Sequence, residues 1–162
     1  MKELLDQYAT YNGWAHQRLL EKINTLSPAQ HHQEVASSFS SLYKTLFHVW
    51  RSETVWLRRF ELQIATAPED HFNGSVQEVS SAITETDRKL LTWVLEKDER
   101  TLREKLSYTN LSGEPFTQPF NTMLMHVFNH STYHNGQLVT ILRQVNAGKI
   151  PDTDFITWSR LQ

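Results

Sequence analysis

The chain has 162 residues, no cysteine and a formal net charge of −2. This length favours a single domain, residues 1–162, with its own apolar core. The lack of cysteine excludes disulfide scaffolds, zinc–thiolate sites and a cysteine nucleophile, and the interspersed charges argue against a nucleic-acid-binding surface. Because no signal-peptide-like block and no window of about 20 apolar residues is present, we expect a cytoplasmic protein without a membrane partner.

Four segments carry the period of about 3.6 residues that is typical of amphipathic helices. The first ends at Ser27-Pro28 and has an apolar stripe of Leu4, Tyr8, Tyr11, Ala15, Leu19, Ile23 and Leu26. The second covers about 41–61, with a stripe of Leu42, Leu46, Val49, Trp56 and Phe60. The third opens with the capping-box pair Ser75 and Glu78. The fourth begins near Asn121, a good N-cap residue, and ends at Ala147-Gly148.

Between the third and fourth segments, "LREKLSYTNLSGEPFTQPF" alternates loosely and has prolines near its end, which allows a short β-hairpin. The tail "KIPDTDFITWSRLQ" is expected to pack Phe155, Ile156 and Trp158 on the body. Four helices of about 20 residues with one apolar stripe each predict an all-α four-helix bundle.

Three histidines recur every fourth residue in "HVFNHSTYHNGQL", and helix geometry limits how they can bind a metal. At about 1.5 Å per residue, His126 and His134 lie about 12 Å apart along the axis, too far for one ion. His130 and His134 lie closest to the apolar stripe of their helix, so they are the better pair. A third ligand must come from another helix, and His48 is the only histidine of the second segment.

Glu53 falls on the apolar stripe of the second segment, where an unpaired carboxylate is unexpected. It either orients a ligand histidine or acts as an acid or base beside the ion, or else it pairs with Arg58 or another arginine, or reaches solvent. Three further histidines, His31, His32 and His71, lie in polar connecting segments and are expected on the surface.

Several motifs resemble the DinB/YfiT-like metalloenzyme family: "YNGWAHQRLL", "SFSSLYKTLFHVWRSETVWLRR", "HVFNHSTYHNGQL" and "DTDFITW". The resemblance implies an up-down-down-up bundle, often a homodimer, that binds a divalent metal through His48, His130 and His134. The sequence departs from the family pattern at Asn135, where the relatives have arginine, and at His16, where they usually have asparagine.

Three neutral imidazoles leave positions on an ion open, which is typical of a catalytic site. Zinc and nickel both suit histidine ligands, and the bound ion could activate water or a thiol. The resemblance favours a thiol-dependent S-transferase that joins a low-molecular-weight thiol to an electrophilic small molecule. The alternatives are a metal-dependent hydrolase and a non-catalytic metal-binding stress-response protein. For an enzyme we expect an open cleft at the ion, lined by Trp50, Asn129, Tyr133 and Gln137, with His126 beside a ligand or at the rim.

Overall fold

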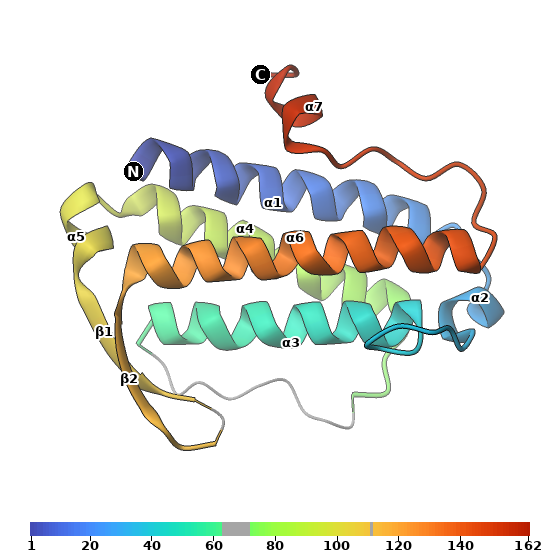
Figure 1. Ribbon diagram of the computed structural model, residues 1–162, viewed down its shortest axis with the longest axis horizontal. Coiled ribbons are helices and arrows are strands. Elements are labelled where there is room, and N and C mark those ends of the chain that lie inside the picture. The colour runs from blue at the N-terminus through green and yellow to red at the C-terminus, as the bar shows by residue number, and fades with distance from the viewer. Residues whose placement is uncertain (63–71, 111) are drawn as a thin grey trace.

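The computed structural model describes residues 1–62, 72–110 and 112–162 (Figure 1). Its four long helices are α1 (Lys2–Ile23), α3 (Leu42–Phe60), α4 (Val76–Glu96) and α6 (Phe120–Gln144). In Figure 1, α1 and α6 run in one direction and α3 and α4 in the other. α1 packs against α4 and α6, and α3 packs against the same two helices. The predicted up-down-down-up four-helix bundle is therefore confirmed.

Two of the long helices begin at serine caps, of which the sequence predicted the one at Ser75. The hydroxyl of Ser41 accepts a hydrogen bond from the amide of Lys44 at 3.2 Å. Ser75 and Glu78 form the predicted capping box, in which each side chain accepts from the backbone amide of the other residue. Both arrangements pair amides that have no partner inside the helix, which fixes where α3 and α4 start.

The start of α6 differs from the prediction. Pro119, not Asn121, occupies the N-cap position, and Asn121 lies inside the first turn. The amide of Phe120 donates to the carbonyl of Glu104 at 3.1 Å, so the helix continues directly from a strand pairing. This backbone bond replaces the side-chain cap that the sequence suggested.

The end of α6 also differs in detail. The helix ends at Gln144, and Asn146 takes the left-handed conformation (φ 54°) before Gly148 does (φ 76°). The amide of Ala147 donates to the carbonyl of Leu142 at 3.0 Å, which is the long bond of a Schellman motif. Asparagine tolerates this conformation better than most residues, so the chain leaves the helix earlier than the glycine suggested.

A β-hairpin between α4 and α6 confirms the predicted break in helical structure. The short helix α5 (Glu99–Arg103) leads into β1 (Lys105–Thr109), which pairs antiparallel with β2 (Pro115–Pro119). The prolines stand at the two ends of β2, where strands tolerate them. Tyr108 of β1 packs edge-on against Trp56 of α3, with ring centroids 5.4 Å apart, so the hairpin reaches the face of α3.

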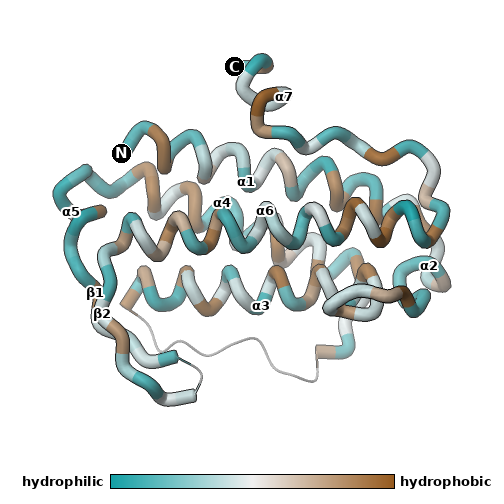
Figure 2. Tube along the Cα trace, viewed as in Figure 1, coloured by the Kyte–Doolittle hydropathy of each residue, from teal (hydrophilic) through white to brown (hydrophobic). Residues whose placement is uncertain are grey.

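Apolar residues recur along all four long helices and build the core in two parts (Figure 2). One part includes Leu5, Leu57, Leu90 and Phe128, and the other includes Leu19, Leu46, Ile83 and Leu138. On every long helix, buried polar residues separate these two parts. We call them the polar layer: Asn12, His16, Glu53, Asp87 and Ser131.

The remaining short helices are α2 (Pro28–His32) and α7 (Phe155–Ser159). In the tail, Trp158 is buried and Phe155 packs on Tyr8 and Tyr11, as predicted. Ile156 is 55% exposed, so its predicted packing is wrong. None of the helices in the described ranges has the length and apolar character needed to cross a membrane.

Candidate metal centre

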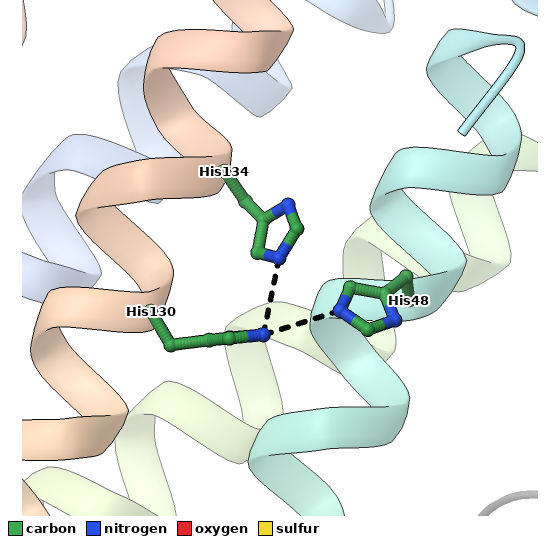
Figure 3. Close-up of side chains that lie close together, drawn as sticks. All are labelled: His48, His130 and His134. Atoms are coloured by element: carbon green, nitrogen blue, oxygen red, sulfur yellow. Dashed lines mark hydrogen bonds between the residues drawn. The ribbon is translucent and has the colours of Figure 1, made fainter. Parts of the chain in front are cut away.

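Three histidine side chains from two helices converge beside the bundle core (Figure 3). His48 projects from α3, and His130 and His134 project from successive turns of the antiparallel neighbour α6. The Nε2 atom of His130 lies 3.1 Å from that of His48 and 3.0 Å from that of His134. We call this group the three-histidine site. The structure thus brings together the three residues that the sequence proposed as ligands.

The electrostatics of the site keep its imidazoles neutral. Burial, as the largest cause, and the neighbouring histidines together lower the pKa of His48 to about 4 and that of His130 to about 3. Burial also lowers the pKa of His134. Neutral imidazoles have a free lone pair, which is the state required of a metal ligand.

Two side chains hold the imidazoles in position. The Nδ1 atom of His134 lies 2.7 Å from Oε1 of Gln137. Because an amide oxygen only accepts, Nδ1 carries the proton and Nε2 keeps its lone pair for the site. The ring of Phe39 stacks on that of His48, with centroids 4.2 Å apart, and also contacts His134. Gln137 itself donates to Tyr133 and to Ser38.

The spacing of the nitrogens fits a divalent cation. Zinc holds histidine nitrogens at about 2.0–2.1 Å, and in a tetrahedral arrangement this places them about 3.3 Å from one another. The observed separations of 3.0 and 3.1 Å lie close to that value. Within the described ranges no carboxylate joins the three imidazoles as a fourth ligand. The residues present therefore fit an ion that keeps open positions.

A cavity of about 440 Å³ opens beside His48. It lies between one face of α3 and the turn of the β-hairpin, and its walls include Val55, Trp56 and Arg59. The sequence analysis expected Trp50, Asn129, Tyr133 and Gln137 along a cleft at the ion, and none of these four is among the residues that line this cavity. The ring of Trp50 packs edge-on against those of Phe47 and Phe72.

The other candidate residues of α6 have different surroundings. Gln137 contacts His134, as described, and Tyr133 packs its ring edge-on against His134 although it is 61% exposed. His126 is exposed and its ring lies 5.2 Å from that of Trp56, at the side of the cavity. Asn129 is exposed and is not among the residues that line the cavity.

Glu53 is fully buried, but its hydrogen bonds go to neither a site histidine nor an arginine. Its Oε1 atom accepts from Ser131 at 2.6 Å and from Asn12 at 3.1 Å. Asn12 also donates to Asp87, which forms an ion pair with Nδ1 of His16 at 2.9 Å. The polar layer thus links all four long helices. Both earlier interpretations of Glu53 missed this arrangement.

The polar layer contains a second group, His16, Glu53 and Asp87, whose ligand-type atoms lie within 4.8 Å of one another. Its electrostatics differ from those of the three-histidine site. Burial alone would lower the pKa of His16, but the carboxylates of Asp87 and Glu53 outweigh it and raise this pKa to about 9. Burial and the charge of Asp87 raise the pKa of Glu53 to about 7. At neutral pH, His16 is therefore protonated and paired, which makes it a poor ligand.

The histidines of the connecting segments were expected on the surface. His31 is instead buried, and its Nε2 atom lies 2.8 Å from the carbonyl of Ile23. His32 is exposed, as predicted. His71 lies outside the described residues.

Comparison with known proteins shows to which family this chain belongs. The model of the DinB family matches residues 1–157. The chain belongs to the DinB family. A curated relative, protein DinB of Bacillus subtilis (strain 168), is 27% identical over 153 residues, covering 90% of this chain and 87% of the relative.

Solved structures of DinB-like proteins share the fold. A DinB-like protein of B. subtilis (YjoA) matches with a TM-score of 0.69 at 12% identity, over 91% of this chain and 98% of that one. A DinB-like protein of Bacillus cereus ATCC 10987 matches with a TM-score of 0.65 at 18% identity, over 85% and 89% of the two chains. These identities establish a common DinB-like bundle and leave the chemistry to be argued from the site.

Proposed function

We propose that His48, His130 and His134 bind a divalent metal ion, zinc or nickel, and that this DinB-family chain is a metal-dependent enzyme. The observation that carries the proposal is the convergence of three neutral imidazole nitrogens beside an open cavity of about 440 Å³. A histidine site with open positions is the arrangement of catalytic rather than structural metals. A bound ion of this kind lowers the pKa of a water or thiol that reaches it.

For the reaction we propose transfer of a low-molecular-weight thiol to an electrophilic small molecule. The thiol loses its proton to solvent, its sulfur forms a bond to the electrophilic carbon, and the leaving group departs with its electron pair. The chain has no cysteine, so the sulfur must come from a second molecule. The chain's own residues hold the geometry, since Gln137 keeps the proton of His134 on Nδ1 and Phe39 covers the rings of His48 and His134.

Metal content tests the first part of the proposal. Purified protein is expected to hold about one equivalent of zinc or nickel, and His134→Ala is expected to lose it. His126→Ala is the matched control, because His126 is an exposed histidine two turns before His134 on the same helix. Equal metal in the protein and in His134→Ala would contradict the assignment.

Thiol consumption tests the second part. The protein is offered a panel of small thiols with an electrophilic acceptor, with and without a chelator. We expect thiol consumption that the chelator abolishes. Metal-dependent turnover of an ester or amide without any thiol would indicate a hydrolase, and metal binding without turnover of either kind would indicate a non-catalytic protein. A homodimer remains a prediction from the family, and the mass in solution tests it.

A further inference from the structure

Arg59 of α3 is a buried cation without an anionic partner among the described residues. Its side chain is 7% exposed, and no carboxylate of the described ranges lies within ion-pair distance of it. Its Nη2 atom donates to the carbonyl of Thr109 at 3.1 Å, and its Nε atom is buried without a hydrogen-bond partner. Buried charges in proteins are normally paired, so this arrangement needs a reason.

Aromatic rings hold the guanidinium of Arg59 in place. It lies 4.5 Å from the ring centroid of Trp56 and 4.7 Å from that of Tyr108. These cation–π contacts compensate part of the lost hydration. They also fix the orientation of a planar group with several N–H donors, which suits it to bind an oxyanion.

Arg59 and His48 line the same cavity. The cavity residues of α3 recur at the spacing of one helix face: His48, Ser52, Val55, Trp56 and Arg59. His48 and Arg59 are about 16 Å apart along the axis, but helical side chains lean towards the N-terminus, so Arg59 leans towards His48. Its contact with Trp56, three residues earlier, agrees with this direction.

The cavity wall between His48 and Arg59 determines which kind of molecule can bind there. Val55 and Trp56 offer apolar surface, and Arg51 adds a second guanidinium to the wall. A volume of about 440 Å³ lies within the range of small-molecule sites.

We infer that Arg59 binds the oxyanion of an anionic small molecule, whose apolar middle lies against Val55 and Trp56 and whose other end reaches the three-histidine site. This inference rests on the proposed function for the role of that other end. The anion is a carboxylate or a phosphate monoester, since both present two or more oxygens to a guanidinium. The substrate class is therefore an acidic molecule with an apolar or aromatic part.

Binding of simple probes tests the inference without any turnover. Benzoate, phenyl phosphate and uncharged benzamide are titrated into the full-length protein, and binding is followed by calorimetry. We expect at least one anion to bind about tenfold more tightly than benzamide, because charge-assisted hydrogen bonds add to the ring contact. Arg59→Gln is expected to abolish this preference. Arg58→Gln is the matched control, because it removes the same charge from the neighbouring residue, which is not among those lining the cavity.

A second readout covers the case in which Arg59→Gln fails to fold. In the unchanged protein, the Nε–H resonance of Arg59 is expected to shift on titration with the anion that binds and to stay in place with benzamide. Equal affinity for the anions and benzamide, or equal weakening in both glutamine variants, would overturn the inference. So would an Arg59 resonance that no anion moves.

The same titration in His134→Ala separates this inference from the proposed function. If the three-histidine site binds no metal, the proposed function fails, yet the preference for anions that depends on Arg59 is still expected. If metal binds but Arg59→Gln does not change the affinity for any anion, only the inferred anion site is wrong.

Discussion

The hydrogen bond between Gln137 and His134 offers a sharp test of the three-histidine site. Gln137→Leu removes the acceptor of the 2.7 Å bond from Nδ1 of His134 and leaves all three imidazoles in place. Without it, the imidazole can place its proton on Nε2, where it blocks the ion. Loss of such a partner typically weakens metal binding about 10- to 100-fold, or about 1.4–2.7 kcal/mol. Gln137 is only half-buried, so water can replace it in part, and we expect the lower end of this range.

The assay is a competition titration of zinc against a chromophoric chelator. Tyr133→Phe serves as the control, because it removes a hydroxyl that contacts Gln137 but leaves the bond to His134. We expect its affinity to stay within about twofold of the unchanged protein, as for most surface substitutions. Gln137→Glu is expected to raise the affinity, since a carboxylate is a stronger acceptor. Zinc affinity that is equal in Gln137→Leu and the unchanged protein would refute the reasoning.

Three further predictions concern the bundle itself. Glu53→Ala removes the buried carboxylate that accepts from Ser131 and Asn12 and is expected to lower the free energy of unfolding by about 1–3 kcal/mol, measured by urea denaturation. His16 has a raised pKa in the folded protein, so its pairing with Asp87 stabilises fully below pH 6.5 and is lost as the pH rises through about 9. The stability gap between the protein and His16→Gln should therefore shrink from pH 6 to pH 9.5, and a gap that widens would contradict the assignment. Ser75→Ala removes a capping box and should cost about 1 kcal/mol by the same denaturation, while a change below a few tenths would show the cap to be dispensable.

Local signals were enough to predict the bundle. The stripe of α3 and the cap at Ser75 depend on neighbours in the sequence, and the structure confirms them. The prediction failed where the backbone bonds to a distant segment, as at Phe120, whose amide pairs with Glu104 across the hairpin. Such bonds have no local sequence signal, so helix ends that adjoin strands are the least predictable part of the fold.

The spacing of the histidines in the sequence predicted part of the three-histidine site. His130 and His134 stand one turn apart on a helix, and this alone predicted that they face the same neighbour. Phe39 could not have been found, because it lies in a connecting segment without period and reaches His48 only through the fold. Arg59 could not have been found from the sequence either, because its surroundings depend on Tyr108 of the hairpin.

The polar layer did leave a signal that the sequence analysis overlooked. Asp87 stands four residues after Ile83 and three before Leu90, on the apolar stripe of α4, as Glu53 does on α3. On α1, the assumed stripe began at Leu4, which is 41% exposed, whereas Leu5 is fully buried. A stripe that starts at Leu5 instead of Leu4 includes Asn12 and His16, and both are buried. Two acids and a histidine at stripe positions of three helices would have predicted one shared network.

The position of the polar layer bears on the metal centre, because Ser131 directly follows His130 on α6. Ser131 points inward to Glu53 of α3, while His130 points to His48 of the same helix. Apolar packing is non-directional and tolerates small slides of one helix against another, whereas a hydrogen bond of 2.6 Å between buried groups tolerates little. The Glu53–Ser131 bond therefore fixes the register of α3 against α6 one residue from His130. The same register sets the distance between His48 and His130, on which the proposed binding of a single ion depends.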